Sequence, residues 1–304
     1  MKKLLLILLC LPMIVFGQFT YVPDDNFEQA LINLGYDTFL DDNVITANID
    51  TVTYLNVDNQ SIVDLTGIAD FTALVSLDCS YNNLISLDIS QNTAITDLNC
   101  RNNNLISIDV SNNIALDYLQ CMHNQLTSLD VTQNTVLTEL RCNTNLLTNL
   151  DVSNNTYLDT LVCSNNQLTS LDVSNNTALL VLGFGNFMSG SGNGISILDI
   201  SANTALVILD CINNQLTSLD ISNNTDLVKL YCLGNQLTSL DVSNNLALTY
   251  LWCGANQLTS LDVRNGNNNL LDTNFSCTGN PNLSCINVDD STWSISNWTD
   301  IDPQ

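Results

Sequence analysis

Residues 158–178 read LDTLVCSNNQLTSLDVSNNTA, and copies of this segment make up most of the chain. Its first half carries Leu158, Leu161 and Cys163, a triad that returns at steps of 21 residues. A short fixed period is typical of a solenoid in which each copy forms one coil. Counted by the first residue of the triad, the nine copies begin at Leu74, Ile95, Leu116, Leu137, Leu158, Leu179, Leu206, Leu227 and Leu248.

Both halves of the copy alternate apolar and polar residues, as a β-strand does when one face is buried. In the copy at Ile95, Leu98 and Cys100 are expected to point inward, while Asp97 and Asn99 point outward. One coil cannot bury its leucines alone, so stacked neighbours must complete the core. Two strand-like halves per coil predict a flattened solenoid with one sheet on each broad face and almost no helix.

The pattern LxxLxCxxN followed by LxxLDVSxN resembles the leucine-rich-repeat family, specifically its nested 21-residue class. The resemblance covers about residues 55–265 and implies a leucine-rich-repeat solenoid of the α/β horseshoe-like class. Residues 23–35 read as a short amphipathic helix and resemble the N-terminal cap of internalin-like proteins. The apolar face of this helix is assigned to Phe27, Ala30, Leu31 and Leu34, with Gly35 as its stop.

The two ends of the chain complete the expected organisation. Residues 277–298 resemble the closing segment of secreted surface repeat proteins of the Bacteroidetes, in which a sorting domain often follows; none follows here, so either a fragment or a released protein is expected. The predicted divisions are a signal peptide over 1–17, an N-terminal cap with a divergent first repeat over 18–73, nine repeats over 74–266 with a Gly/Ser-rich insertion at 185–194, and a C-terminal cap over 267–304.

The signal peptide is assigned from Lys2 and Lys3, which precede an apolar run too short to cross a bilayer. Cleavage before Gln18 is expected, which makes the protein secreted or bound to the outer cell surface. No second apolar run follows, so no transmembrane segment is expected.

The composition restricts the class of partner. Asp and Glu number 31 against 6 Lys and Arg, and the formal charge is −25. A surface this acidic repels phosphate backbones, so nucleic acid is not expected as a partner. Hydrophobic residues make up 45% of the chain, which is enough for a folded core and argues against disorder.

Cysteines and asparagines recur in columns. Eight cysteines stand in the inward column of the first half, where we predict reduced, buried thiols because parallel Cβ vectors suit an S–S bond poorly. Cys277 and Cys285 lie outside that column around a Gly-Asn-Pro turn, and a disulfide is predicted between them. The chain has no CxxC pair and one histidine, so neither zinc nor another cofactor is expected. Two inward asparagine columns are expected to bond the turn backbone; they are Asn82, Asn103, Asn124, Asn145, Asn166, Asn214, Asn235 and Asn256, and Asn92, Asn113, Asn134, Asn155, Asn176, Asn203, Asn224 and Asn245.

An aspartate column marks the outward side of the second half: Asp88, Asp109, Asp130, Asp151, Asp172, Asp199, Asp220, Asp241 and Asp262. One interpretation is a calcium ladder, with Asp172, Asp199, Asp220 and Asp241 as its candidate ligands. The other is a solvated face in which each carboxylate accepts local hydrogen bonds from Ser, Thr or backbone. The second interpretation is favoured, because no dedicated calcium loop is present.

The outward positions of the first half vary from copy to copy, and the last three copies gather apolar and aromatic residues. This set is the predicted partner-binding site and consists of Tyr231, Trp252, Tyr250, Leu233, Ile208, Ile212 and Lys229. Aromatic clusters on a surface are typical of interfaces. The alternatives are ordinary β-propensity at exposed strand positions, or cover by the C-terminal cap.

The sequence therefore predicts a secreted or cell-surface binding module for a protein or glycan ligand, with adhesion among its roles. The alternatives are a structural surface spacer without a specific ligand and a calcium-binding solenoid that uses the aspartate column. No catalytic residue is assigned and no enzyme is expected, because there is no nucleophile–base pair, phosphate loop or metal triad.

Overall fold

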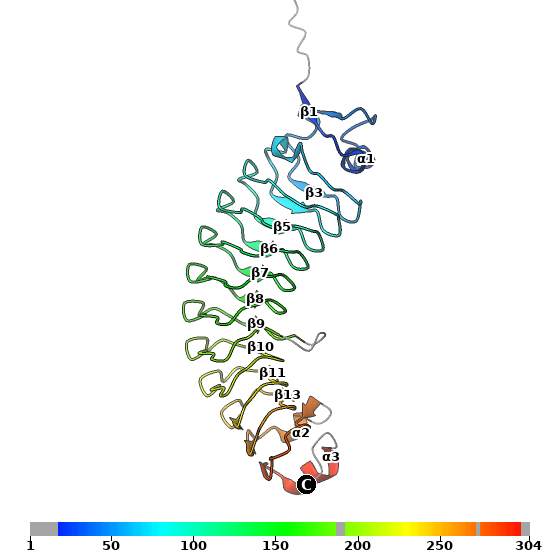
Figure 1. The fold of residues 1–304 in the computed structure, drawn as a ribbon. Coiled ribbons are helices and arrows are strands. Elements are labelled where there is room, and N and C mark those ends of the chain that lie inside the picture. Colours follow the sequence, from blue (N-terminus) through cyan, green and yellow to red (C-terminus); the bar gives the residue numbers. More distant parts are fainter. Residues whose placement is uncertain (1–17, 187–191, 272–273, 299–304) are drawn as a thin grey trace, which may run out of the picture.

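A computed structural model describes residues 18–186, 192–271 and 274–298, and its coils stack into an arched solenoid (Figure 1). The predicted signal peptide and the middle of the predicted insertion lie outside the described residues. The fold is the predicted leucine-rich-repeat solenoid. Its main feature is a parallel sheet of eleven strands, to which each coil contributes one short strand.

The long sheet is built from the first half of each copy. Successive strands pair in register, so that Leu119 lies opposite Leu140 and Leu140 opposite Leu161. In chain order its strands are β3 (Tyr54–Asn56), β4 (Ser76–Asp78), β5 (Asp97–Asn99), β6 (Tyr118–Gln120), β7 (Glu139–Arg141), β8 (Thr160–Val162), β9 (Val181–Gly183), β10 (Ile208–Asp210), β11 (Lys229–Tyr231), β13 (Tyr250–Trp252) and β15 (Phe275–Ser276).

The second half of the copy departs from the prediction of a sheet on each face. Among the described residues it forms strands only near the C-terminus: β12 (Ser239–Asp241), β14 (Ser260–Asp262) and β16 (Ile286–Asn287). Elsewhere the backbone turns at once, because the N–H two residues after each column aspartate bonds to its carboxylate, as Ser153 does to Asp151 at 2.9 Å. A second turn bond follows, from the N–H of Asn155 to the carbonyl of Val152. These local bonds replace the ladder that the alternating pattern predicted.

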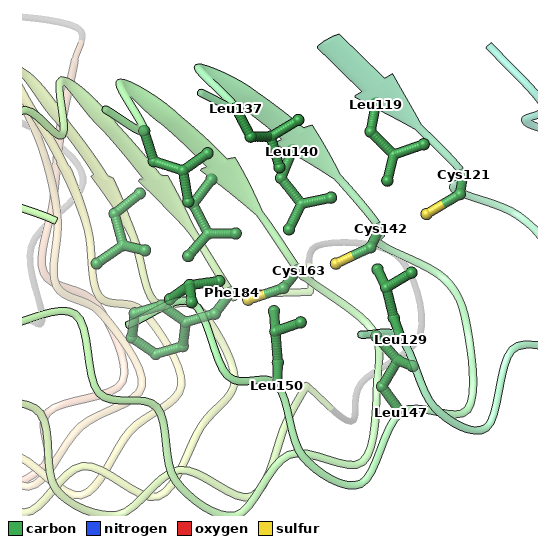
Figure 2. Close-up of a cluster of buried hydrophobic side chains, with 14 of the residues drawn as sticks. Leu119, Cys121, Leu129, Leu137, Leu140, Cys142, Leu147, Leu150, Cys163 and Phe184 are labelled. Atoms are coloured by element: carbon green, nitrogen blue, oxygen red, sulfur yellow. The ribbon is translucent and has the colours of Figure 1, made fainter. Parts of the chain in front are cut away.

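The core is a stack of leucine rows closed by the cysteine column, as predicted. Figure 2 shows Cys121, Cys142 and Cys163 in one row, with Phe184 next in it. All eight column cysteines are buried. Phe184 is also fully buried and takes the cysteine position in the coil that precedes the insertion. The insertion does not disturb the register, since Leu182 on β9 lies opposite Leu209 on β10.

The predicted disulfide between Cys277 and Cys285 is wrong. Strand β15 places Phe275 opposite Leu251 and Ser276 opposite Trp252, so Cys277 follows Cys253 as a further buried member of the cysteine column. Cys285 lies just before β16 on the other sheet and is exposed, with its thiol 3.7 Å from Asn287 Oδ1. The segment after residue 266 thus begins with one more coil, which the sequence analysis treated only as a cap.

The asparagine columns join each coil to its neighbour. Asn145 Nδ2 donates to the carbonyls of Cys121 and Cys142 at 3.1 and 3.0 Å, and its Oδ1 accepts the N–H of Leu126. In the other column, Asn155 Nδ2 donates to the carbonyls of Val131 and Asn134. Its Oδ1 has no donor among the described residues. Both columns therefore bond backbone groups that the turns leave unpaired, as predicted.

The N-terminal end of the core is covered by a cap. It contains β1 (Phe19–Tyr21), paired antiparallel with β2 (Asn43–Ile45), helix α1 (Asp25–Asn33) and the 3-10 helices η1 (Thr46–Asn48) and η2 (Ile68–Asp70). The carboxylate of Asp24 caps α1 through the N–H groups of Asn26 and Phe27 and also accepts those of Val63 and Asp64 from the first repeat. Phe27, Ala30 and Leu31 are buried as predicted, whereas Leu34 is exposed, because α1 ends before it.

The C-terminal end is covered by α2 (Asn268–Leu271) and α3 (Ser291–Asn297). Trp298 packs on Phe275 with ring centroids 4.2 Å apart and meets Trp293 edge-on at 6.3 Å. The indole of Trp298 is therefore buried over the last strand of the long sheet. No helix among the described residues is long and apolar enough to cross a membrane.

We expect the two asparagine columns to contribute unequally to stability. Asn145→Ala leaves two carbonyls and one N–H without a partner, so it should lower the free energy of unfolding by about 3 kcal/mol. Asn155→Ala leaves two carbonyls and removes an oxygen that accepted nothing, so the loss should be smaller, about 2 kcal/mol. Urea unfolding followed by circular dichroism measures both, and an equal or reversed order would contradict the assignment.

We expect the thiols to separate into two classes. Burial raises the pKa of Cys121 and Cys163 to about 12, so these thiols stay protonated and unreactive. Iodoacetamide should label Cys285 in the native protein and nothing in a Cys285→Ser variant. After unfolding without reductant, all ten cysteines beyond residue 18 should react. Mass spectrometry that finds only eight reactive thiols would restore the disulfide.

Candidate functional site

The candidate site lies on the strand face, by which we mean the outward side of the eleven-stranded sheet. Its in-register strands place Tyr231 beside Trp252 and Lys229 beside Tyr250. Side chains at these positions point away from the core, because Leu230 and Leu251 between them are fully buried. The structure therefore brings together the aromatic residues that the sequence analysis assigned to one patch.

The aromatic side chains of the patch contact one another. The ring centroids of Tyr231 and Trp252 are 5.1 Å apart and the planes meet at 67°, which is an edge-to-face contact. The ammonium of Lys229 lies 4.9 Å from the ring centroid of Tyr250, within the range of a cation–π interaction. All four side chains are half-buried, so they are held in place and still reach the surface.

The aliphatic members of the patch differ in exposure. Ile208 and Leu233 are half-buried, as expected for the rim of an interface. Ile212 is only 2% exposed, so the prediction that it is part of the exposed patch is wrong. The backbone before the insertion runs against it, because Asn186 donates its N–H to the Ile212 carbonyl. We define the aromatic patch as Ile208, Lys229, Tyr231, Leu233, Tyr250 and Trp252.

The charges of the strand face are more balanced than those of the whole chain. Over the nine regular copies its outward strand positions hold four acidic and three basic residues: Asp78, Asp97, Glu139 and Asp210, with Arg101, Arg141 and Lys229. Arg141 is paired with Glu139 on the same strand. Arg101 lies 5.2 Å from the ring centroid of Tyr81. A protein partner would meet much less uniform repulsion here than elsewhere on the molecule.

The aspartate column has the local bonds that the solvated-face interpretation predicted. Each of its nine carboxylates accepts the backbone N–H two residues further on, at 2.8 to 3.2 Å. The hydroxyl and the N–H of Ser153 hold the pKa of Asp151 below its ordinary value, and Ser201 does the same for Asp199. Of the four calcium candidates, Asp172 and Asp220 have pKa values lowered by the same kind of bonds. Asp241 accepts its bond from Ser243 at 2.8 Å.

One carboxylate group was missed by the sequence analysis. Carboxylate oxygens of Asp25, Glu28 and Asp42 lie within 4.8 Å of one another in the N-terminal cap. Glu28 is fully buried, and its Oε1 accepts the N–H groups of Asp41 and Asn43 at 3.0 Å each. These bonds tie the turn before β2 to helix α1. No spacing in the sequence indicated this contact, because it joins segments of different structure.

Comparisons with known proteins come next to this geometry. No protein-family model matches the chain. Over 72 residues, 24% of this chain and 8% of the relative, it is 42% identical to internalin J of Listeria monocytogenes serotype 4b (strain F2365). The solved functional domain of InlJ from L. monocytogenes, which includes a cysteine ladder, matches with a TM-score of 0.67 at 36% identity. That match covers 90% of this chain and 62% of the InlJ chain.

A more distant structure shares the fold alone. The Arabidopsis receptor kinase HAESA, solved with the peptide hormone IDA and the co-receptor SERK1, matches with a TM-score of 0.62 at 23% identity. The match covers 78% of this chain and 43% of the HAESA chain.

We expect the aspartate column to gain little from calcium, since one oxygen of each carboxylate already accepts a local bond. The melting temperature in millimolar CaCl₂ should equal that in EDTA, because a ligand that binds only the native state must stabilise it. Asp172→Asn and Asp220→Asn should leave this comparison unchanged. A rise in calcium that either substitution removes would support the calcium ladder instead.

Proposed function

Because the chain is a leucine-rich-repeat protein of internalin type, we propose that it is a binding module that docks a protein partner on the aromatic patch. The observation that carries the proposal is the pairing of Tyr231 with Trp252 on adjacent strands, half-buried and pointing outward. Tyrosine and tryptophan provide large rigid contact areas at a low cost in conformational entropy, which is why they recur at binding hot spots.

Three further features support a protein ligand. The strand face varies from coil to coil, whereas the aspartate column repeats one residue, and only a varied surface specifies one partner. The patch joins apolar rings to a nearby cation, Lys229, in a chain that has few cations. Neighbouring folds bind protein ligands, as HAESA does with its peptide hormone. A glycan ligand would use the same rings, and a spacer without a ligand would leave them unused.

The proposal includes a location and excludes catalysis. The basic and apolar residues at the start of the chain support export to the cell exterior, as a secreted or surface-attached protein that takes part in adhesion. We propose binding without chemistry, because the patch offers aromatic rings and one ammonium group but no nucleophile with a base beside it.

We expect Trp252→Ala to weaken binding of the partner by about 2 kcal/mol while the melting temperature changes little. The partner is first captured from host and bacterial surface fractions with the protein from residue 18 onward and then purified. Affinities of wild-type, Trp252→Ala and Tyr231→Ala proteins are measured by isothermal titration calorimetry, and stability by thermal melting.

A matched control is Tyr157→Ala, which removes an exposed ring from another side of the solenoid and should leave the affinity unchanged. If the patch only supports the C-terminal cap, both patch variants should unfold at lower temperature. Unchanged affinity in Trp252→Ala and Tyr231→Ala together would remove the patch as the binding site.

A further inference from the structure

A single acidic side chain stands in the row of the strand face that carries the two aromatic rings. The register of four consecutive strands places Gly183, Asp210, Tyr231 and Trp252 side by side. The row therefore runs from a position without a side chain, through a carboxylate, to two rings. Asp210 was not among the residues assigned to the patch from the sequence.

The carboxylate of Asp210 is half-buried and largely unpaired. Its Oδ1 accepts the N–H of Ile212 at 3.1 Å. The same oxygen lies over the backbone of Gly185, so close that a Cβ on this glycine would be 2.1 Å away. Burial raises the pKa of Asp210. Within residues 18–186, 192–271 and 274–298, the ion pairs are Arg141 with Glu139 and Arg264 with Asp262, so no described cation pairs with Asp210.

The resident cation nearest in sequence does not neutralise this group. Lys229 lies on β11 opposite Ile208 and Tyr250, in the row next to that of Asp210. Its ammonium is placed over the ring of Tyr250. A partly desolvated carboxylate thus sits beside the Tyr231–Trp252 pair without a positive charge of its own.

We infer that Asp210, Tyr231 and Trp252 form a recognition site for an arginine side chain of the protein partner, an inference that rests on the proposed function. A guanidinium group is flat and weakly hydrated, so it stacks on aromatic rings and at the same time donates two hydrogen bonds to a carboxylate. The missing side chain at Gly183 keeps the other side of Asp210 open. The charge of −25 draws a basic segment toward the molecule and adds to this complementarity.

The three tryptophans of the chain allow the site to be observed directly. In protein labelled with ¹⁵N at tryptophan, the indole signals of Trp252, Trp293 and Trp298 are resolved, and Trp252→Phe assigns the first. N-acetyl-arginine methylamide is titrated to tens of millimolar. The Trp252 signal should move saturably, while those of Trp293 and Trp298 in the C-terminal cap stay in place.

Two comparisons test the roles of charge and shape. The citrulline analogue has the same shape without the charge and should not shift Trp252. The lysine analogue should bind about threefold or more weakly, because it neither stacks as a plane nor donates a paired bond. Equal shifts with citrulline, or equal affinity for lysine, would overturn the inference.

Variants of the protein complete the test. Asp210→Asn should reduce the affinity for the arginine probe at least about tenfold, because it removes the charge and keeps the shape. Asp78→Asn is the matched control, since Asp78 stands in the same row, accepts the same bond from the N–H two residues on and has Asn99 as its neighbour. It should leave the affinity unchanged. Tyr231→Leu keeps the apolar bulk and should also weaken binding. Unaltered affinity in Asp210→Asn would overturn the inference.

The result separates this inference from the proposed function. If the arginine probe fails to move Trp252 while Trp252→Ala still loses the purified partner, the patch is the binding site and arginine is not its ligand. If both experiments fail, the patch has no part in binding.

Discussion

Hydrogen bonds from asparagine amides to the backbone of the neighbouring coil are the interaction on which the solenoid depends. Asn145 lies in one coil and bonds carbonyls of its own coil and of the one before it. Its oxygen then fixes the N–H of Leu126 where the backbone enters the second half. A leucine side chain can slide along an apolar surface, but these bonds fit only one stacking position. The in-register sheet, the leucine rows and the alignment of outward side chains all follow from that position.

The same register gives the two outward surfaces different properties. On the aspartate side, each carboxylate bonds its own turn, so the column is a repeated structural device and its residues are interchangeable. On the strand face, backbone bonds alone hold the strands, and the outward residues are left without a structural duty. Residues such as Tyr231 and Trp252 can therefore vary without loss of the fold, and the face is available for recognition.

The period of the sequence predicted the fold, the inward columns and the neighbours of Tyr231, because these follow from alternation and equal spacing. It could not predict where spacing changes. Cys277 lies 24 residues after Cys253, outside the regular step, so its place in the column became visible only from the pairing of β15. The second sheet and the exposure of Ile212 were wrong for a related reason. Both depend on bonds between a turn and its neighbour, which alternation does not report.

The loop between β9 and β10 has a consequence for how such a chain diversifies. It lengthens one step from 21 to 27 residues, yet Leu182 still meets Leu209, and Phe184 fills the space that a thiol occupies elsewhere. Length added at the rim is thus invisible to the stacking lattice. Gene duplications that copy whole coils, and small in-frame insertions at a rim, would each preserve every existing contact. New surface can in this way be acquired in discrete steps, while the rest of the molecule keeps its shape.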